Sequence, residues 1–314
     1  MVNLYKESSS KQKTLRFTHL QKSNIKAYAA WIAICIIWGT TYLAIRVGVT
    51  ELPPMLFAGV RWIIAGLILI TFLKLSGRRF PSLNDLKHIA VVGIALLGVA
   101  NGLVVVAEQW IPSGLAALLI STLPFWMVGF ESAAKKGPKI NFYTISGLLI
   151  GIAGVFLIFG KDFTFLMDGN NLIGVLCLMG AVISWSLGSI YSKYKKINVD
   201  PLTSATFQML IAGTLQVTLG LSLGELSIFT LNTDGILATA YLVLFGSIFG
   251  FASYIYAIAH LPLSLVSTYA YVNPVIAIFL GWLILNEDFN LNILIAATLI
   301  ITGVIMVQRG SKVT

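Results

Sequence analysis

The chain has 314 residues, of which 57% are hydrophobic and only 11% are charged. A typical soluble domain carries about 25% charged residues, so this composition excludes a soluble enzyme, a disordered protein and a fibrous protein. The net charge of +9 therefore gives information about the orientation of the chain in a bilayer and does not indicate binding to nucleic acid. We do not expect nucleic acid as a partner. The sequence predicts an all-α integral membrane protein.

The first 26 residues are polar and basic. They lack the short apolar stretch and the small-residue cleavage site of a signal peptide, and an apolar run long enough to span a bilayer follows them. We therefore expect residues 1–26 to form a basic cytoplasmic N-terminal tail and the first membrane helix to be an uncleaved anchor.

Ten apolar runs have the length of a membrane-spanning helix, which needs roughly 20 residues to cross about 30 Å of hydrocarbon. They cover residues 27–49, 55–75, 88–109, 114–133, 141–160, 170–192, 202–222, 235–259, 264–285 and 291–308. Proline-containing links such as Pro53-Pro54 separate several of them and favour tight turns between antiparallel neighbours. The sequence predicts ten transmembrane helices.

Lysine and arginine residues are distributed unevenly among the predicted loops. If the N-terminus is cytoplasmic, 18 of the 21 Lys and Arg residues lie on the cytoplasmic side, which is the side where such residues accumulate. Because ten is an even number, the C-terminus then lies on the same side. We expect a multi-pass protein of the plasma (cytoplasmic) membrane, with both termini cytoplasmic and its cations against the anionic leaflet.

The two halves of the chain repeat each other at spacings of 147 to 150 residues. The matches include Trp38 with Trp185, Pro54 with Pro201, Pro124 with Pro274, and Gly154-Val155 with Gly303-Val304. The drift in spacing predicts small insertions near the third and eighth spans. Each copy holds five spans, an odd number, so the two copies have inverted topology. The predicted parts are a first repeat (27–160), an external linker (161–169), a second repeat (170–308) and a cytoplasmic C-terminal tail (309–314).

Several motifs together resemble the drug/metabolite transporter superfamily, specifically its ten-helix EamA-type permeases. They are Trp38-Gly39-Thr40-Thr41-Tyr42 with Ile45-Arg46, Arg61-Trp62 with Ala65-Gly66, Pro112-Ser113-Gly114 with Pro124, and Asn273-Pro274 with Glu287. One departure is visible, because the first-half counterpart of Glu287 is Gly137. The resemblance implies a secondary permease, commonly an exporter of small metabolites, amino acids or drugs.

Helical spacing places polar and aromatic side chains of several spans on common faces. Such faces line either a packed core or a central cavity, and in a membrane bundle polar-tipped aromatic residues have little reason to face lipid. The predicted cavity residues are Trp38, Thr41, Tyr42, Asn101, Trp185, Ser189, Gln208, Tyr254, Tyr269 and Asn273.

Ionisable side chains at membrane depth cost about 2.5–3.5 kcal/mol each at the bilayer centre. Arg46 lies near the outer end of the first span, where it either extends to the surface or faces the cavity. Arg61 and Glu108 lie in the outer third of adjacent spans, so we expect either a structural ion pair or a pair with a gating or proton-coupling role. Glu131 precedes Lys135 by four residues, which predicts an ion pair at the interface.

Pro124 and Pro274 lie inside predicted spans, where a proline frees a backbone carbonyl and kinks the helix. Their equivalent positions predict a pair of hinges. Glycines at four-residue spacing favour close packing of helices within the chain, and we expect a monomer. These pairs are Gly98 with Gly102, Gly147 with Gly151, and Gly246 with Gly250.

The sequence contains no phosphate-binding Walker loop, no zinc-ligand pattern and no nucleophile elbow. Cys35 and Cys177 lie inside apolar runs and are expected to be free thiols. We therefore expect no enzyme activity, no metal and no cofactor. The predicted function is a secondary active transporter, with export as the expected direction, that moves small metabolites, amino acids or drug-like amphipathic solutes by alternating access. A channel and a lipid-modifying membrane enzyme are the alternatives.

Overall fold

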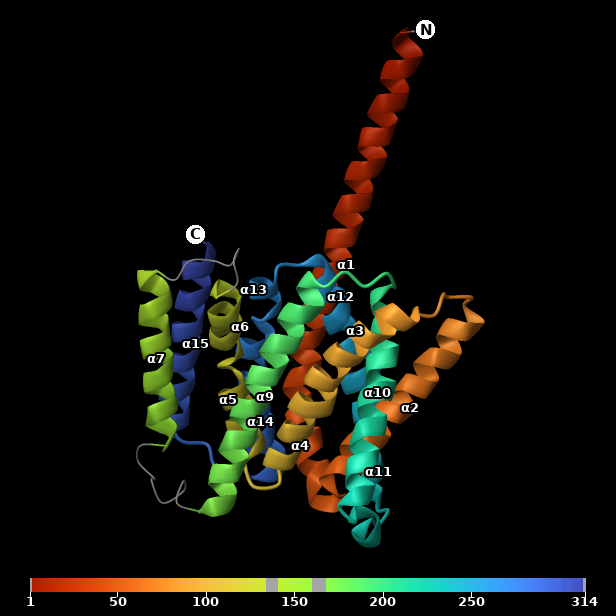
Figure 1. The fold of residues 1–314 in the computed structure, drawn as a ribbon. Coiled ribbons are helices and arrows are strands. Elements are labelled where there is room, and N and C mark those ends of the chain that lie inside the picture. Colours follow the sequence, from red (N-terminus) through yellow and green to blue (C-terminus); the bar gives the residue numbers. More distant parts are fainter. Residues whose placement is uncertain (1, 134–140, 160–167, 313–314) are drawn as a thin grey trace.

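The computed structural model describes residues 2–133, 141–159 and 168–312, which form helices joined by short turns, with no strand among them (Figure 1). The first half contains α1 (Val2–Glu51), α2 (Pro54–Leu75), α3 (Leu83–Gly93), the π-helix η1 (Ile94–Asn101), α4 (Gly102–Ala107), α5 (Ser113–Ile120), α6 (Leu123–Ser132) and α7 (Phe142–Phe159). The second half contains α9 (Gly169–Tyr194), α10 (Pro201–Ser222), the 3-10 turn η2 (Glu225–Ile228), α11 (Thr233–Tyr241), the π-helix η3 (Leu242–Phe251), α12 (Ala252–His260), α13 (Leu263–Val266), α14 (Tyr269–Leu285) and α15 (Leu291–Lys312). The predicted all-helical class is confirmed.

The first helix is longer than predicted. α1 begins at Val2 and continues through the expected tail, so that its N-terminal part projects from the bundle (Figure 1). No proline occurs before Pro53 to interrupt it. Most of the predicted linker 161–169 and both Lys135 and Gly137 lie outside the described residues.

Six helical segments of the described residues are long and apolar enough to cross a membrane. They are Ile25–Glu51, Pro54–Leu75, Leu83–Ala107, Ser113–Ser132, Gly169–Tyr194 and Thr233–His260. Three shorter apolar helices, Phe142–Gly151, Tyr269–Leu285 and Leu291–Val307, accompany them. α10 has 22 residues but is not among the six, because it carries polar side chains such as Thr206 and Gln208, which are buried inside the bundle.

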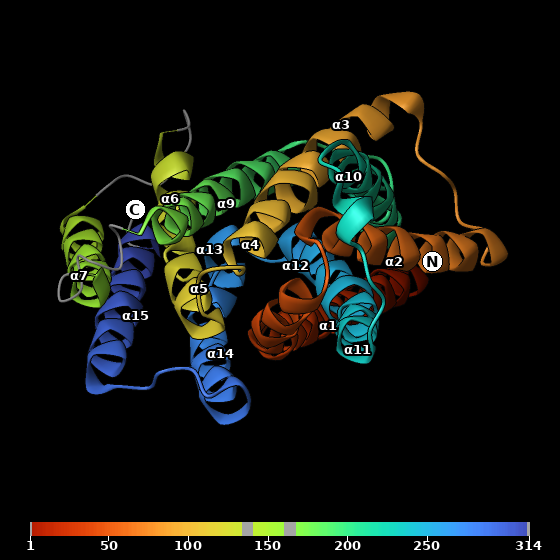
Figure 2. The same ribbon diagram turned by 90° about the horizontal axis from the view of Figure 1, so that it is seen from below.

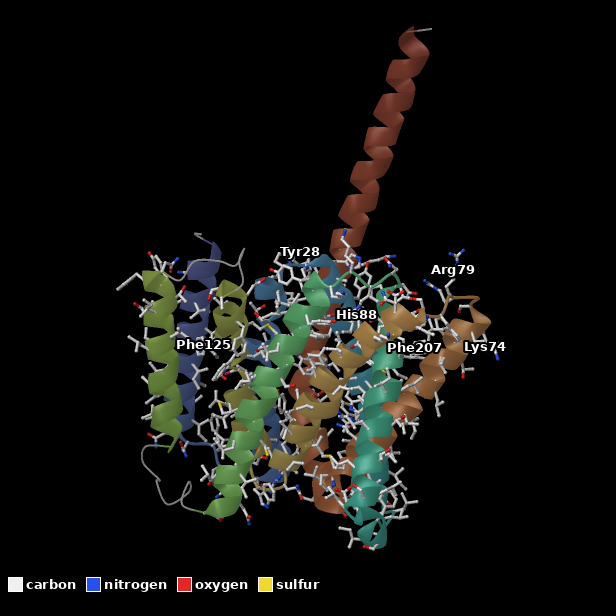
Figure 3. All side chains as sticks on the ribbon, in the orientation of Figure 1. Tyr28, Lys74, Arg79, His88, Phe125 and Phe207 are labelled. Carbon is white, nitrogen blue, oxygen red and sulfur yellow. The ribbon has the colours of Figure 1, made fainter. Side chains whose placement is uncertain are left out.

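Helices at equivalent positions of the two halves pack against each other. α2 lies along α10 and α7 lies along α15, at opposite edges of the bundle (Figure 2). α1 packs on α11, η3 and α12, just as α9 packs on α3, η1 and α4. Both chain termini lie at one end of the bundle (Figure 1), and Lys74 and Arg79 lie toward the same end (Figure 3).

The extra residues of the second half lie in a loop. α2 ends at Leu75 and α10 at Ser222, which is 147 residues later, whereas the N-caps of the next helices, Ser82 and Asn232, are 150 residues apart. The insertion therefore precedes the third and eighth spans instead of falling inside them. A residue added within a helix turns all that follows by about 100° and misplaces its buried face, whereas a loop tolerates insertion.

Glycine permits the closest helix contacts. A Cβ atom at Gly147 of α7 would overlap the backbone oxygen of Gly303 in α15, and one at Gly59 of α2 would overlap that of Gly213 in α10. The prediction that glycines serve packing within the chain is confirmed at Gly147, while the contact of Gly59 with Gly213 was not among the predicted ones. Backbone contact of this kind stabilises helix pairs in lipid, where dispersion replaces the hydrophobic effect.

We expect Gly147→Ala to lower the free energy of unfolding by about 1–3 kcal/mol, because the added methyl group forces α7 and α15 apart. Thermal unfolding of the purified protein in detergent measures this loss. Gly129→Ala is the matched control, since a Cβ at Gly129 meets nothing within 4 Å. Equal melting temperatures of the two variants would contradict the proposed contact.

Candidate functional site

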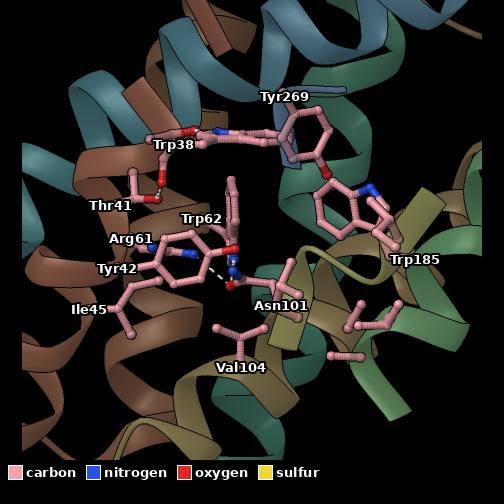
Figure 4. Close-up of a pocket in the computed structure, with 16 residues that line it drawn as sticks. Trp38, Thr41, Tyr42, Ile45, Arg61, Trp62, Asn101, Val104, Trp185 and Tyr269 are labelled. Atoms are coloured by element: carbon pink, nitrogen blue, oxygen red, sulfur yellow. Dashed lines mark hydrogen bonds between the residues drawn. The ribbon is translucent and has the colours of Figure 1, made fainter. Parts of the chain in front are cut away.

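A cavity of about 80 Å³ lies in the middle of the bundle (Figure 4). Residues of α1, α2, η1, α4, α5, α6, α9, η3 and α14 surround it. The lining consists of Trp38, Thr41, Tyr42, Ile45, Arg61, Trp62, Ala100, Asn101, Val104, Ile120, Leu123, Ala181, Val182, Trp185, Gly246 and Tyr269. Six of the ten predicted cavity residues are in this set, together with Arg61. The volume exceeds the roughly 10–15 Å³ that one water molecule needs, and is well below the roughly 300–1,000 Å³ typical of drug-sized ligand sites.

The rings of Trp38, Trp185 and Tyr269 form one wall of the cavity, and the ring of Tyr254 packs behind them. The ring of Trp38 lies 5.4 Å from Trp185, 5.1 Å from Tyr254 and 5.0 Å from Tyr269, measured between centroids. Trp38 donates from Nε1 to the Gly246 carbonyl at 3.2 Å, and Trp185 donates from Nε1 to the Tyr254 hydroxyl at 2.9 Å. Edge-to-face aromatic pairs with satisfied N–H groups are rigid, so this wall presents a fixed apolar surface.

Arg61 supplies the positive charge at the cavity and is only 2% exposed. Its guanidinium donates to Oδ1 of Asn101 at 2.5 Å and lies 4.4 Å from the ring centroid of Trp62. Trp62 donates to the same Oδ1 at 3.2 Å. Among the described residues no carboxylate oxygen lies within 4.0 Å of the guanidinium. Arg61 is therefore held by an amide and a ring, and its charge has no anionic partner.

The expected ion pair between Arg61 and Glu108 is not formed, and this corrects the sequence-based prediction. Both carboxylate oxygens of Glu108 are buried without a hydrogen-bond partner. Asn101 lies two helical turns before Glu108, about 10 Å along the helix axis. The guanidinium of Arg61 lies at the depth of Asn101 and donates its hydrogen bond to the Asn101 amide oxygen. Arg46, the third charged candidate, donates to the backbone carbonyl of Glu108 and does not line the cavity.

Four predicted cavity residues lie behind the lining instead of in it. The hydroxyl groups of Ser189 and Tyr254 are 2.6 Å apart, and Gln208 donates to Ser204 at 2.8 Å. Asn273 lies 3.0 Å from the carbonyl oxygens of Cys35 and Tyr269, to which its amide nitrogen donates. Helical spacing placed these four on inward faces, but the neighbouring helices cover those faces in this conformation.

The two predicted hinge prolines occupy different positions in their helices. Pro124 is at the start of α6, after a break at Ser121 and Thr122, where a missing N–H costs nothing. Pro274 lies inside α14, and the helix break that precedes it is at 267–268.

Glu131, the remaining charged residue considered in the sequence, accepts a hydrogen bond from Tyr194.

Sequence reasoning missed nine lining residues, of which Trp62 matters most chemically because it contacts both Arg61 and Asn101. Its position beside Arg61 in the Arg61-Trp62 motif was a usable signal. The other eight are Ile45, Ala100, Val104, Ile120, Leu123, Ala181, Val182 and Gly246. These small or aliphatic residues carry no signal that separates a cavity wall from a packed core.

Comparison with known proteins gives three findings. The family model of EamA-like transporters matches residues 25–160 and 172–309. The "uncharacterized inner membrane transporter YedA" of Escherichia coli is 36% identical over 302 residues, 94% of each chain, and the "uncharacterized transporter YoaV" of Bacillus subtilis is 26% identical over 90% of this chain and 96% of its own. One solved crystal structure superposes with a TM-score of 0.68 at 20% identity, over 93% of this chain and 99% of that one, which shows a shared fold.

We expect Asn101→Ala to lower the free energy of unfolding by about 1–3 kcal/mol, because Arg61 and Trp62 then lose their shared acceptor. Thermal unfolding in detergent again provides the measurement. Asn170→Ala is the control, since Asn170 is exposed near the start of α9. A variant at Asn101 as stable as this control would argue against the network.

Proposed function

The chain belongs to the EamA-like transporter family, and on that premise we propose that it is a secondary active exporter of small amphipathic solutes. Family membership makes it a membrane transporter of the cytoplasmic membrane, with several membrane-spanning helices. The proposal adds the substrate class, which includes amino acids, other small metabolites and drug-like molecules. It also adds the mechanism, alternating access at the cavity between two five-helix repeats.

We assign ten membrane crossings and two cytoplasmic termini to the protein. Three observations support this topology: the termini lie at one end of the bundle, Lys74 and Arg79 lie toward that end, and the family model matches two successive segments of similar length. The six long apolar segments account for six crossings, and α10 together with the three shorter apolar helices accounts for the other four. α10 is tolerated in lipid because its polar residues face other helices.

The observation that carries the substrate class is an unpaired buried arginine in a cavity with an aromatic wall. A buried cation without an anionic partner is costly, and a carboxylate on the solute removes that cost through paired N–H donors. The rings of Trp38, Trp185 and Tyr269 then cover an apolar body. Among small metabolites, amino acids and drug-like solutes, this chemistry favours a small carboxylate with an aromatic or aliphatic side chain over a cationic solute.

A comparison of equivalent positions in the two repeats supports alternating access, because residues that line the cavity in the first repeat correspond to residues that are covered in the second. Each of the four predicted residues outside the cavity has a counterpart in the first repeat that lines it. The pairs are Ser189 with Tyr42, Gln208 with Arg61, Tyr254 with Val104, and Asn273 with Leu123. If the second repeat adopts the conformation of the first, these four residues line an equivalent cavity that opens toward the opposite side. We assign the hinges to the helix breaks before Pro124 and Pro274.

Equivalent cations close the two ends of the path. Arg46 donates to the carbonyl of Glu108 at the end of α4. Its counterpart Lys193 donates to the carbonyls of Ile258 and Leu261 at the end of α12, both at 2.8 Å, and Ile258 is the counterpart of Glu108. Cations at helix C-termini are favourable. The same contact thus occurs once at each side of the bundle, as two gates of one path require.

Substrate selection is tested with phenylalanine and its neutral amide, phenylalaninamide, as probes in proteoliposomes. We expect the wild type to transport the acid at least tenfold better, and Arg61→Gln to lose about tenfold of that preference, or roughly 1.4 kcal/mol. Arg78→Gln is the control, because Arg78 pairs with Asp200 at the surface. Equal transport of both probes by the wild type would refute the carboxylate proposal, and linear, non-saturating flux would favour a channel.

Alternating access is tested with two equivalent positions in a variant lacking Cys35 and Cys177. Tyr42→Cys should react with a membrane-impermeant thiol reagent from outside only, because Tyr42 lines the cavity that we expect to open to the outside when the Arg46 contact breaks. Ser189→Cys should react from the cytoplasmic side only, and more slowly when substrate holds the outward state. Labelling of both cysteines from one side would contradict exchange between the repeats.

A further inference from the structure

Glu108 differs from the other buried acidic residues in the described part of the chain. Three acidic side chains are buried there: Asp85 is 6% exposed, Glu108 0% and Glu225 7%. Asp85 accepts from Ser82 at 2.7 Å and from the backbone N–H of Asn198 at 3.1 Å. Glu225 accepts from two backbone N–H groups, whereas neither carboxylate oxygen of Glu108 has any partner.

Two cations lie near Glu108, but both are occupied by other acceptors. Arg46 donates to the backbone carbonyl of Glu108, and Arg61 donates to Asn101. Both arginines act on the Glu108 carboxylate through their charge without touching it. An ionised carboxylate would draw at least one guanidinium into a direct bond, because charge-assisted hydrogen bonds are the strongest in a low-dielectric interior. The lack of such a bond favours a neutral carboxylic acid over an ionised carboxylate.

The remaining neighbours do not supply a partner either. Tyr42 of α1 and Glu287 after α14 act electrostatically with Glu108, and the Glu287 carboxylate already accepts from Ser113 and Gly114 at the start of α5. α5 contains no ionisable residue, and the half of α9 nearest to Glu108 contains only Cys177.

We propose that Glu108 is a proton-binding site that is occupied in this conformation. The proton forms an O–H bond with one carboxylate oxygen. When the outer end of the bundle opens, that bond breaks, the proton passes to external water, and Arg46 exchanges the backbone carbonyl of Glu108 for its carboxylate. One proton is thus bound or released for each rearrangement of Arg46. This adds a proton as the coupling ion to the proposed function.

A metal ion fits the site less well than a proton. A cation site needs several oxygen, nitrogen or sulfur ligands, and the described residues contain no group of three His, Cys, Asp or Glu side chains that could hold one. Direct contact with substrate is not indicated either, because Glu108 does not line the cavity. The site lies beside the path and communicates with it through Arg46 and Arg61.

Infrared spectra of the purified full chain, recorded over a range of pH in detergent, test the assignment without any substrate. We expect the wild type to show the absorption of a protonated carboxyl at neutral pH, and to lose it as the pH is raised. E108Q should lack this absorption. E131Q should keep it, because Glu131 accepts a hydrogen bond near the other end of the bundle and is not fully buried. An unchanged spectrum in E108Q, or no such absorption in the wild type, overturns the assignment.

Thermal unfolding of E108Q at neutral pH gives an independent reading. Glutamine has the volume and neutrality of a protonated glutamate, so we expect a melting temperature within about 3 °C of the wild type. A loss of more than about 10 °C would mean that Glu108 is ionised and paired, and would also overturn the assignment. Because neither measurement uses transport, a negative result here leaves the proposed function standing, and failure of the transport assays leaves Glu108 unaffected.

Discussion

Backbone groups at helix ends must find partners inside this bundle, because lipid offers none. Charged side chains from distant parts of the chain provide several of these partners. Glu225 accepts from the N–H groups of Met55 and Leu56 at the start of α2. Glu287 does the same at the start of α5, where it also accepts from the Ser113 hydroxyl at 2.8 Å. Each contact joins the two halves of the chain.

The opposite helix ends are satisfied by cations in the same way. Arg46 and Lys193 occupy equivalent positions and donate to the last carbonyls of α4 and α12. Acidic groups at N-termini and basic groups at C-termini both oppose the helix dipole favourably. The two carboxylates thus join the two repeats, whereas Arg46 and Lys193 each tie together two helices of the same repeat. A motion of one repeat relative to the other must therefore exchange the carboxylate contacts.

Sequence patterns located the helices well where proline or a short link defines their ends. The second span was expected at 55–75 and α2 covers Pro54–Leu75, while the seventh was expected at 202–222 and α10 covers Pro201–Ser222. The π-helices η1 and η3 were not predicted. An α-helix and a π-helix differ in which backbone groups are hydrogen-bonded, and this difference leaves no mark on the hydrophobic composition of the segment. The continuation of α1 to Val2 was missed for a related reason, since a polar segment without proline is compatible with helix or coil.

The sequence by itself determined the family, the helical class and the repeat, because these depend on apolar length and on spacings along one chain. It also identified six cavity residues, since helical periodicity shows which side chains share a face. Only the tertiary structure decided which of those faces is open and which partner each charge takes. Arg61 meets Asn101 and not Glu108, and Ser189 is covered while Tyr42 is open. Such choices depend on the relative depth and rotation of neighbouring helices, which no periodicity within a single helix specifies.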